Sequence, residues 1–214
     1  TLPSAWDAPD PWGSDSYPVD VRFTPEGRIG RYWGIPIIGH MVRWLSLIPH
    51  IFVLMFFAIL VAFAALFTWI PVLFLGRQAR WAYAILGGFL RWSIRVQTWG
   101  QLLSGTYPPF TGAEADGQHV RVRIDEEQRI NRFWGIPLLG LFVRCIILIP
   151  HFVILWILAI IVGFLLLFAW IPVLIYGRQA DVIYSLVGGF VRWQARVGAY
   201  LMLLSGTYPP FRLD

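Results

Sequence analysis

Two histidines are the residues of this sequence whose type and position most suggest ligand chemistry. His50 and His151 each follow an Ile-Pro pair at the opening of a long apolar run. An imidazole in such a place could bind haem, chlorophyll or a metal ion. Neither histidine has a second histidine or a carboxylate within one helical turn, as a metal site would require. We therefore expect both to form hydrogen bonds at the level of the lipid headgroups, with ligand binding as the alternative.

Six arginines lie inside or beside apolar segments, where a charge is costly and often functional. A guanidinium group suits bidentate binding of phosphate or carboxylate, so these side chains are candidates for contact with anionic lipids or with a partner subunit. The alternative is that they snorkel to the membrane surface. They form two equivalent sets: Arg43, Arg91 and Arg95, and Arg144, Arg192 and Arg196.

No set of residues resembles a catalytic site. Acidic residues are confined to the terminal regions, a central linker and Asp181, so no carboxylate pair lies within the apolar segments. The serines there lack a nearby His–Asp context. The single cysteine, Cys145, excludes an intrachain disulfide and a cysteine-based metal site. The sequence predicts a protein that is not an enzyme and has no cofactor and no bound metal.

Composition indicates an integral membrane protein. Charged residues are 14% of the chain, against about 25% in soluble domains. Residues 44–76 and 145–177 contain no charged residue at all, and each run exceeds the roughly 20 residues that cross a bilayer. All 17 basic residues are arginine and the net charge is +5, which favours an anionic membrane surface. Because these arginines interrupt apolar segments, a nucleic-acid partner is not expected.

The chain contains one unit twice. Residues 28–110 match residues 129–211 at a constant offset of 101, and 47 of the 83 aligned positions are identical. Four parts follow: a Pro-rich polar arm (1–27), repeat one (28–110), an acidic linker (111–128) and repeat two (129–214). Short alternating stretches at Val19–Phe23 and His119–Arg123 have strand character.

Each repeat begins its apolar run with one clear membrane helix. Pro49 can open it, because proline is tolerated in a first helical turn, and residues 51–75 continue it. The next segment, residues 79–104, carries Arg91 and Arg95 near its middle. It is either a second span or an amphipathic helix in the interface. We expect the pairs Gly87-Gly88 and Gly188-Gly189 to permit close helix packing.

The duplication bears on the number of crossings. Copies with the same flanking arginines should face the same way in the membrane, so each should cross an even number of times. We favour two crossings per copy and four in total, with an interfacial second helix or a shallow hairpin of residues 44–75 as alternatives. The predicted fold class is therefore an all-α integral membrane protein of two parallel tandem repeats. The side faced by the N-terminus stays open.

Three motifs occur in both copies: Ile48-Pro49-His50, Arg91-Trp92 with Arg95-Val96, and Tyr107-Pro108-Pro109-Phe110, each repeated 101 residues later. Together they resemble the bacterial membrane family catalogued as domain of unknown function 4389. The sequence has Gly-Arg-Gln where that family often has Gly-Arg-Tyr-Pro. The resemblance implies a membrane protein and no known activity.

The sequence as a whole predicts a multi-pass protein of the bacterial cytoplasmic membrane. We expect a non-catalytic structural or accessory subunit of a larger complex, whose partners are anionic lipids and other integral membrane subunits. A transporter or channel component is one alternative, because internal repeats are common in such folds. A lipid-binding or membrane-shaping protein is the other.

Overall fold

The computed structural model describes residues 17–24, 29–113, 119–126 and 129–213. The Pro-rich part of the predicted arm and the centre of the predicted linker lie outside these ranges. The first copy is built from β1 (Val19–Phe23), η1 (Arg31–Gly34), α1 (Ile38–Ala65), α2 (Trp69–Leu75), α3 (Arg80–Ala82), the π-helical turn η2 (Tyr83–Gly87) and α4 (Gly88–Gly100). The second consists of β2 (Val120–Ile124), η3 (Arg132–Gly135), α5 (Leu139–Leu166), α6 (Trp170–Tyr176) and α7 (Asp181–Leu201).

The first long helix begins eleven residues earlier than predicted. α1 starts at Ile38 and continues through Pro49, so the expectation that Pro49 opens the helix is wrong. Pro49 lacks an N–H group and cannot bond the carbonyl of Leu45, yet tertiary contacts described below hold the helix together. A helix break precedes Pro71, because α1 ends at Ala65 and α2 begins at Trp69. The second copy repeats this pattern around Pro150 and Pro172.

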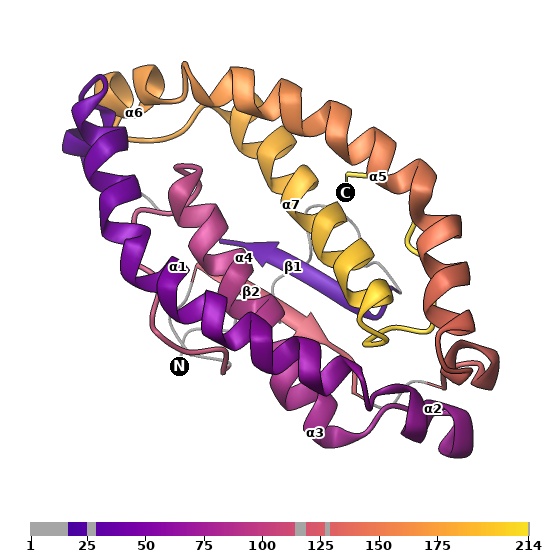
Figure 1. The fold of residues 1–214 in the computed structure, drawn as a ribbon. Coiled ribbons are helices and arrows are strands. Elements are labelled where there is room, and N and C mark those ends of the chain that lie inside the picture. Colours follow the sequence, from indigo (N-terminus) through magenta and orange to yellow (C-terminus); the bar gives the residue numbers. More distant parts are fainter. Residues whose placement is uncertain (1–16, 25–28, 114–118, 127–128, 214) are drawn as a thin grey trace, which may run out of the picture.

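The helices form one layer in which each copy is an antiparallel hairpin. α1 packs on α4, and α5 packs on α7. The two inner helices, α4 and α7, meet at the centre of the layer, where Gln97 Nε2 donates to Gln194 Oε1 at 2.7 Å. The long helices α1 and α5 flank this pair on opposite sides and run in opposite directions (Figure 1).

The two copies are related by a local twofold axis through a small sheet. β1 and β2 pair antiparallel, and Val21 lies opposite Val122, its own equivalent at the offset of 101. The register is therefore symmetric about this pair, and α1 and α5 are exchanged by the rotation (Figure 1). The sheet departs from the predicted all-α class, although both stretches with strand character do form strands. Their pairing with each other was not foreseen.

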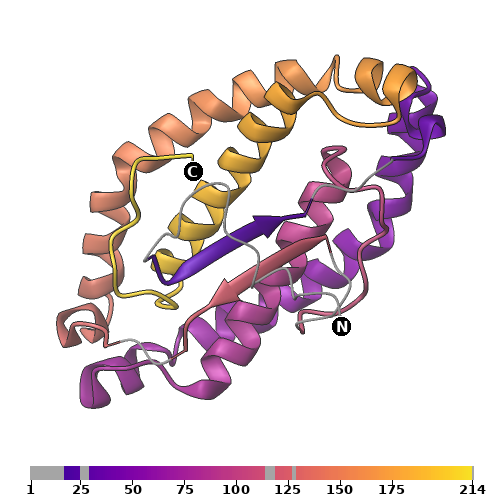
Figure 2. The same cartoon turned by 180° about the vertical axis from the view of Figure 1, so that it is seen from behind.

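The sheet covers one face of the helix layer, as seen in Figure 2, where the strands lie in front of α4 and α7. Val19, Val21, Val122 and Ile124 are buried. β1 precedes the first copy but packs on α7 of the second, whereas β2 packs on α4 of the first. Each strand is thus exchanged between the copies.

The copies also interlock at both ends of the layer. η1 of the first copy packs against α6, and η3 of the second packs against α2. The Ile29 N–H donates to Gly177 O at 2.7 Å, and the Ile130 N–H donates to Gly76 O at 2.8 Å. We call these contacts the η1–α6 junction and the η3–α2 junction. They make the two repeats one body.

The surface of the long helices is apolar almost all round. α1 buries one stripe only, which lies against α4: Gly39, Arg43, Leu47, His50, Val61 and Ala64. α5 buries the equivalent stripe. Two helical stretches, Ile38–Leu75 and Leu139–Leu166, are long and apolar enough to cross a membrane by length and composition. This agrees with the predicted pair of membrane helices.

Candidate functional site

Motif residues of each copy meet in one cluster, which we call the histidine cluster. Its histidine and tryptophan are buried, whereas its tyrosine and phenylalanine are partly exposed. In the first copy Trp92 Nε1 donates to His50 Nδ1 at 3.0 Å. Phe110 stacks on the imidazole with ring centroids 3.8 Å apart, and Tyr107 lies 5.0 Å away. The cluster of the second copy, with the same geometry, consists of His151, Trp193, Tyr208 and Phe211.

Tyr107 links the cluster to the interrupted turn of α1. Its hydroxyl donates to the carbonyl of Ser46 at 2.8 Å. Ser46 directly follows Leu45, whose carbonyl Pro49 cannot pair. The hydroxyl of Tyr208 donates to Ile147 O at 2.9 Å in the second copy. The Ile-Pro-His and Tyr-Pro-Pro-Phe motifs therefore act together to hold a proline-containing helix closed.

The geometry of His50 does not suit ligand binding. Its Nδ1 accepts the Trp92 proton, so the proton of the neutral ring lies on Nε2. A metal-bound histidine instead donates from the nitrogen that does not hold the metal. His50 and His151 are fully buried, and the described residues contain no group of three His, Cys, Asp or Glu side chains that could hold a metal. The hydrogen bonds that the structure gives to these histidines come from tryptophan, and their place at headgroup level stays a prediction.

We predict that Trp92→Phe destabilises the first copy by about 1–3 kcal/mol, because it leaves the buried Nδ1 of His50 without its donor. Thermal unfolding in detergent, followed by circular dichroism, measures the loss. Trp193→Phe is the matched change in the second copy and should have the same effect. Trp81→Phe changes a partly exposed tryptophan and serves as the neutral control. Equal midpoints for all three variants would contradict the role of the bond.

A second buried group surrounds Arg43. Its guanidinium carbon lies 4.8 Å from the ring centroid of Trp33 and 4.3 Å from that of Trp99. Its Nη1 donates to Trp99 O and, at 2.9 Å, to Ser104 O. The cation is thus held between two aromatic faces and by carbonyls at the end of α4. Arg144 occupies the equivalent place, with bonds to Gly140 O, Tyr200 O and Leu201 O at 3.2, 3.2 and 2.7 Å.

The inner-helix arginines bind the sheet and the chain that leaves each helix. Arg91 Nε donates to Val122 O at 3.2 Å, and Arg192 Nε donates to Val21 O at 3.0 Å. These are the carbonyls of the central strand pair. Arg95 Nη1 donates to Ala113 O at 2.9 Å.

Arg196 is buried beneath Tyr17, with its guanidinium carbon 5.8 Å from the ring centroid. The Tyr17 hydroxyl donates to Thr207 O at 2.9 Å, and burial raises the pKa of Tyr17 to about 12. Tyr17, two residues before β1, is therefore fixed to the second copy.

Contact of these arginines with lipids or partners stays a prediction. The hydrogen bonds described above for Arg43, Arg91, Arg95, Arg144 and Arg192 go to backbone carbonyls of their own chain. Only Arg91 among the six is outside the buried class. The exchanged strands and the chain after each inner helix supply the carbonyls for Arg91, Arg95 and Arg192. The signal in the sequence was the pair of alternating stretches, whose unpaired edges need donors.

The glycine pairs lie where strands and the following chain approach the inner helices. A Cβ added at Gly87 would lie 3.2 Å from Ile124 Cδ1, and one at Gly188 would lie 3.4 Å from Phe23. Gly189 approaches Leu213, with 2.6 Å from the added Cβ to the carbonyl oxygen. A Cβ at Gly88 would lie 3.7 Å from Phe57 of α1, so this glycine also faces a neighbouring helix.

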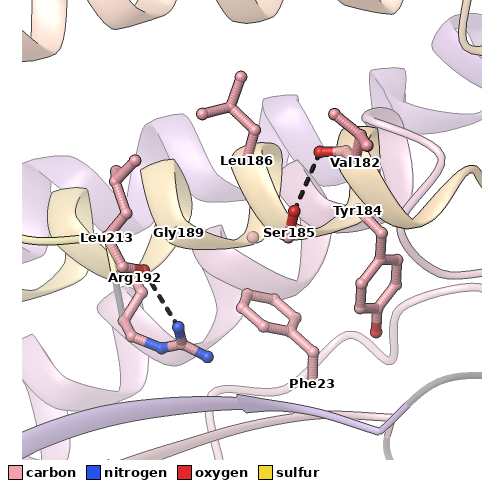
Figure 3. A pocket seen from close by; sticks show the side chains of 9 residues that line it. Phe23, Val182, Tyr184, Ser185, Leu186, Gly189, Arg192 and Leu213 are labelled. Atoms are coloured by element: carbon pink, nitrogen blue, oxygen red, sulfur yellow. Dashed lines mark hydrogen bonds between the residues drawn. The ribbon is translucent and has the colours of Figure 1, made fainter. Parts of the chain in front are cut away.

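A pocket lies in the second copy (Figure 3). It has a volume of about 350 Å³ and lies between β1, α7 and the C-terminal segment. Phe23 and Tyr184 form one wall, with ring centroids 6.3 Å apart. Arg192 lies at its edge and donates to Leu213 O at 3.1 Å. The lining is almost entirely apolar and offers no nucleophile with an adjacent base.

Sequence comparison agrees with the doubled geometry. The family model described as "Domain of unknown function (DUF4389)" matches residues 38–112 and again residues 139–212. The chain belongs to the DUF4389 family. No curated protein and no solved structure is detectably similar to it. Each DUF4389 segment contains one complete histidine cluster, so the family motifs correspond to a structural unit that closes within one copy.

Proposed function

We propose that this DUF4389 protein is a non-catalytic structural or accessory subunit of a larger membrane assembly. The observation that supports this most is the contrast between interior and surface. The buried motif side chains, among them His50, Trp92 and Arg95, bond to carbonyls and rings of their own chain, whereas α1 and α5 expose apolar side chains on every side but one. Exposed apolar surface of this extent indicates contact with lipid or with other proteins.

The surface of the helix layer also offers apolar grooves. One groove of about 500 Å³ runs between α1 and the end of α5, across α4 and α7. Its lining includes Trp44, Ile51, Val162 and Phe190, with no charged residue. Such a groove suits the apolar side chains of a neighbouring membrane helix. A bacterial cytoplasmic membrane with anionic lipids is the proposed location, and the proposal requires embedding but no particular number of crossings.

The test is purification of the tagged chain from its native membrane into lipid nanodiscs without a detergent step. We expect one or more integral membrane proteins to co-elute in fixed stoichiometry. Phe63→Ala and Phe164→Ala change equivalent exposed positions of the two copies, and loss of the partner in one variant would identify the copy that binds it. A chain that elutes alone from native discs would refute the assembly role.

A membrane-shaping role is the second candidate, because the helices form one layer with the sheet on a single face (Figures 1 and 2). Tubulation of anionic liposomes by the purified chain would favour it. Transport is supported less, because the hydrogen bond between Gln97 and Gln194 closes the centre between α4 and α7. Solute flux in proteoliposomes that contain the purified chain would favour the transporter or channel role.

A further inference from the structure

The position of the sheet limits how the helices can lie in a membrane. The local twofold axis passes between Val21 and Val122, and the four main helices extend alongside the strands in one layer (Figure 1). The axis exchanges α1 and α5, which run in opposite directions. If both helices crossed a bilayer, the axis would lie in its midplane. The centre of the sheet would then lie in the midplane too.

The sheet is too polar for that position. Asp20, Arg22, Arg121 and Arg123 lie within two residues of the central pair, which is about 7 Å along a strand. Arg22 Nε lies 2.9 Å from Asp20 Oδ2. An arginine at the bilayer centre costs about 2.5–3.5 kcal/mol, and the described strands pair only with each other. Open strand edges do not occur in contact with the hydrocarbon region.

An axis along the membrane normal removes this conflict. The sheet then faces water, both copies lie at the same depth, and their equivalent arginines face the same side, as the charge rule requires. The opposite face of the helix layer enters the lipid. Its groove is lined by apolar residues with the neutral Ser93, Gln97, Gln101 and Gln194. With the twofold axis along the membrane normal, all four main helices run parallel to the membrane plane.

We infer that the chain is embedded in a single leaflet, with α1, α4, α5 and α7 parallel to the membrane surface and the β1–β2 sheet on the water side. The acyl chains of that leaflet are the ligand of the exposed apolar faces. This inference rests on the embedding that the proposed function requires and is independent of any partner subunit. In this arrangement the chain does not cross the membrane, in contrast to the four crossings predicted from the sequence.

Labelling of single cysteines from each side of the membrane separates the arrangements. In a Cys145→Ser background, Ala113→Cys marks the sheet side, and Arg77→Cys and Arg178→Cys mark the exposed turns at the two ends of the layer. A membrane-impermeant maleimide is applied to right-side-out and inside-out vesicles of the native membrane. We expect all three variants to react in the same vesicle preparation and none to react in the other.

Every other labelling pattern overturns the inference. Four crossings would place Arg77→Cys and Arg178→Cys together on the side opposite to Ala113→Cys. Inverted copies would place the two turns on opposite sides from each other. A turn that reacts only after detergent is added lies in lipid, which also contradicts the inferred arrangement. Because the substituted side chains are exposed, elution of each variant in detergent checks that folding is retained.

A depth measurement provides an independent test. Leu45, Phe52 and Ile59 of α1 and Leu66, the residue that caps its C-terminus, are exposed at seven-residue spacing. Spin labels at these positions, in single-cysteine variants, report depth through their accessibility to oxygen and to a nickel chelate. We expect the same depth at all four. A crossing helix would separate the outer two by about 31 Å along its axis, with the deepest label in the middle. Co-purification of a partner is unaffected by either outcome.

Discussion

Arg43→Met is expected to lower the unfolding midpoint of the protein in detergent by about 6–12 °C. The change removes two hydrogen bonds from a charged donor, each of about 1.5–3 kcal/mol, and the aromatic contacts with Trp33 and Trp99. Methionine carries no charge, so the cost of burying the guanidinium is also removed, and this offsets part of the loss. We expect a net loss of about 3 kcal/mol, which at about 2–4 °C per kcal/mol gives the stated shift.

The two copies supply the controls for this prediction. Arg144→Met removes the equivalent guanidinium and should act in the same direction, because its bonds to three carbonyls are lost. Arg77→Met changes an exposed arginine in the turn after α2 and should leave the midpoint unchanged. If Arg43→Met behaved like Arg77→Met, the guanidinium would have a lipid or partner contact as its main interaction, as the sequence alone suggested.

Gly34→Ala is expected to open the η1–α6 junction and leave the η3–α2 junction closed. The added methyl group would lie 2.4 Å from the backbone nitrogen of Leu174. Backbone atoms cannot rotate away, so η1 must separate from α6. Overpacking of this kind costs about 1–3 kcal/mol or more. Hydrogen exchange at the Ile29 amide, which bonds Gly177 O, should become about tenfold faster or more.

The equivalent glycine gives a crossed experiment. At Gly135 the added Cβ would lie 2.4 Å from the nitrogen of Leu73. Gly135→Ala should therefore accelerate exchange at Ile130 and spare Ile29. Gly163→Ala, where nothing lies within 4 Å of the new atom, should change neither amide. If both junction variants accelerated both amides equally, the two ends of the layer would open as one cooperative unit and the separate junctions would be refuted.

The sequence predicted the parts of the fold that follow from local pattern. The offset of 101 paired each residue with its equivalent, and the uncharged runs located the long apolar helices. Pro49 was misjudged, because the local rule places proline in the first turn of a helix, whereas α1 continues through it and a tyrosine 61 residues further along the chain bonds to the adjacent turn. The strands were visible as alternating stretches. Their exchange was not, because no local pattern shows that β1 packs on α7.

The hydrogen-bond acceptors of the arginines within the chain could not be predicted for the same reason. Apolar surroundings made lipid phosphate the obvious acceptor, since no carboxylate lies in the apolar segments. The structure provides backbone carbonyls instead, at the ends of α4 and α7 and at the central strand pair. Histidine was similarly assigned to the interface, although the tryptophan that donates to it lies 42 residues further along in both copies.

The exchange of strands has a consequence for synthesis on the ribosome. Val21 receives its guanidinium donor from a residue 171 positions later. At about 5–20 residues per second, the first strand therefore waits roughly 10–30 s for the helix that covers it. During that time the nascent first half carries an uncovered strand edge and an unfilled contact at η1. A chain released early would expose the same surfaces. Synthesis of the C-terminal half is therefore the step that commits the whole polypeptide to its native state.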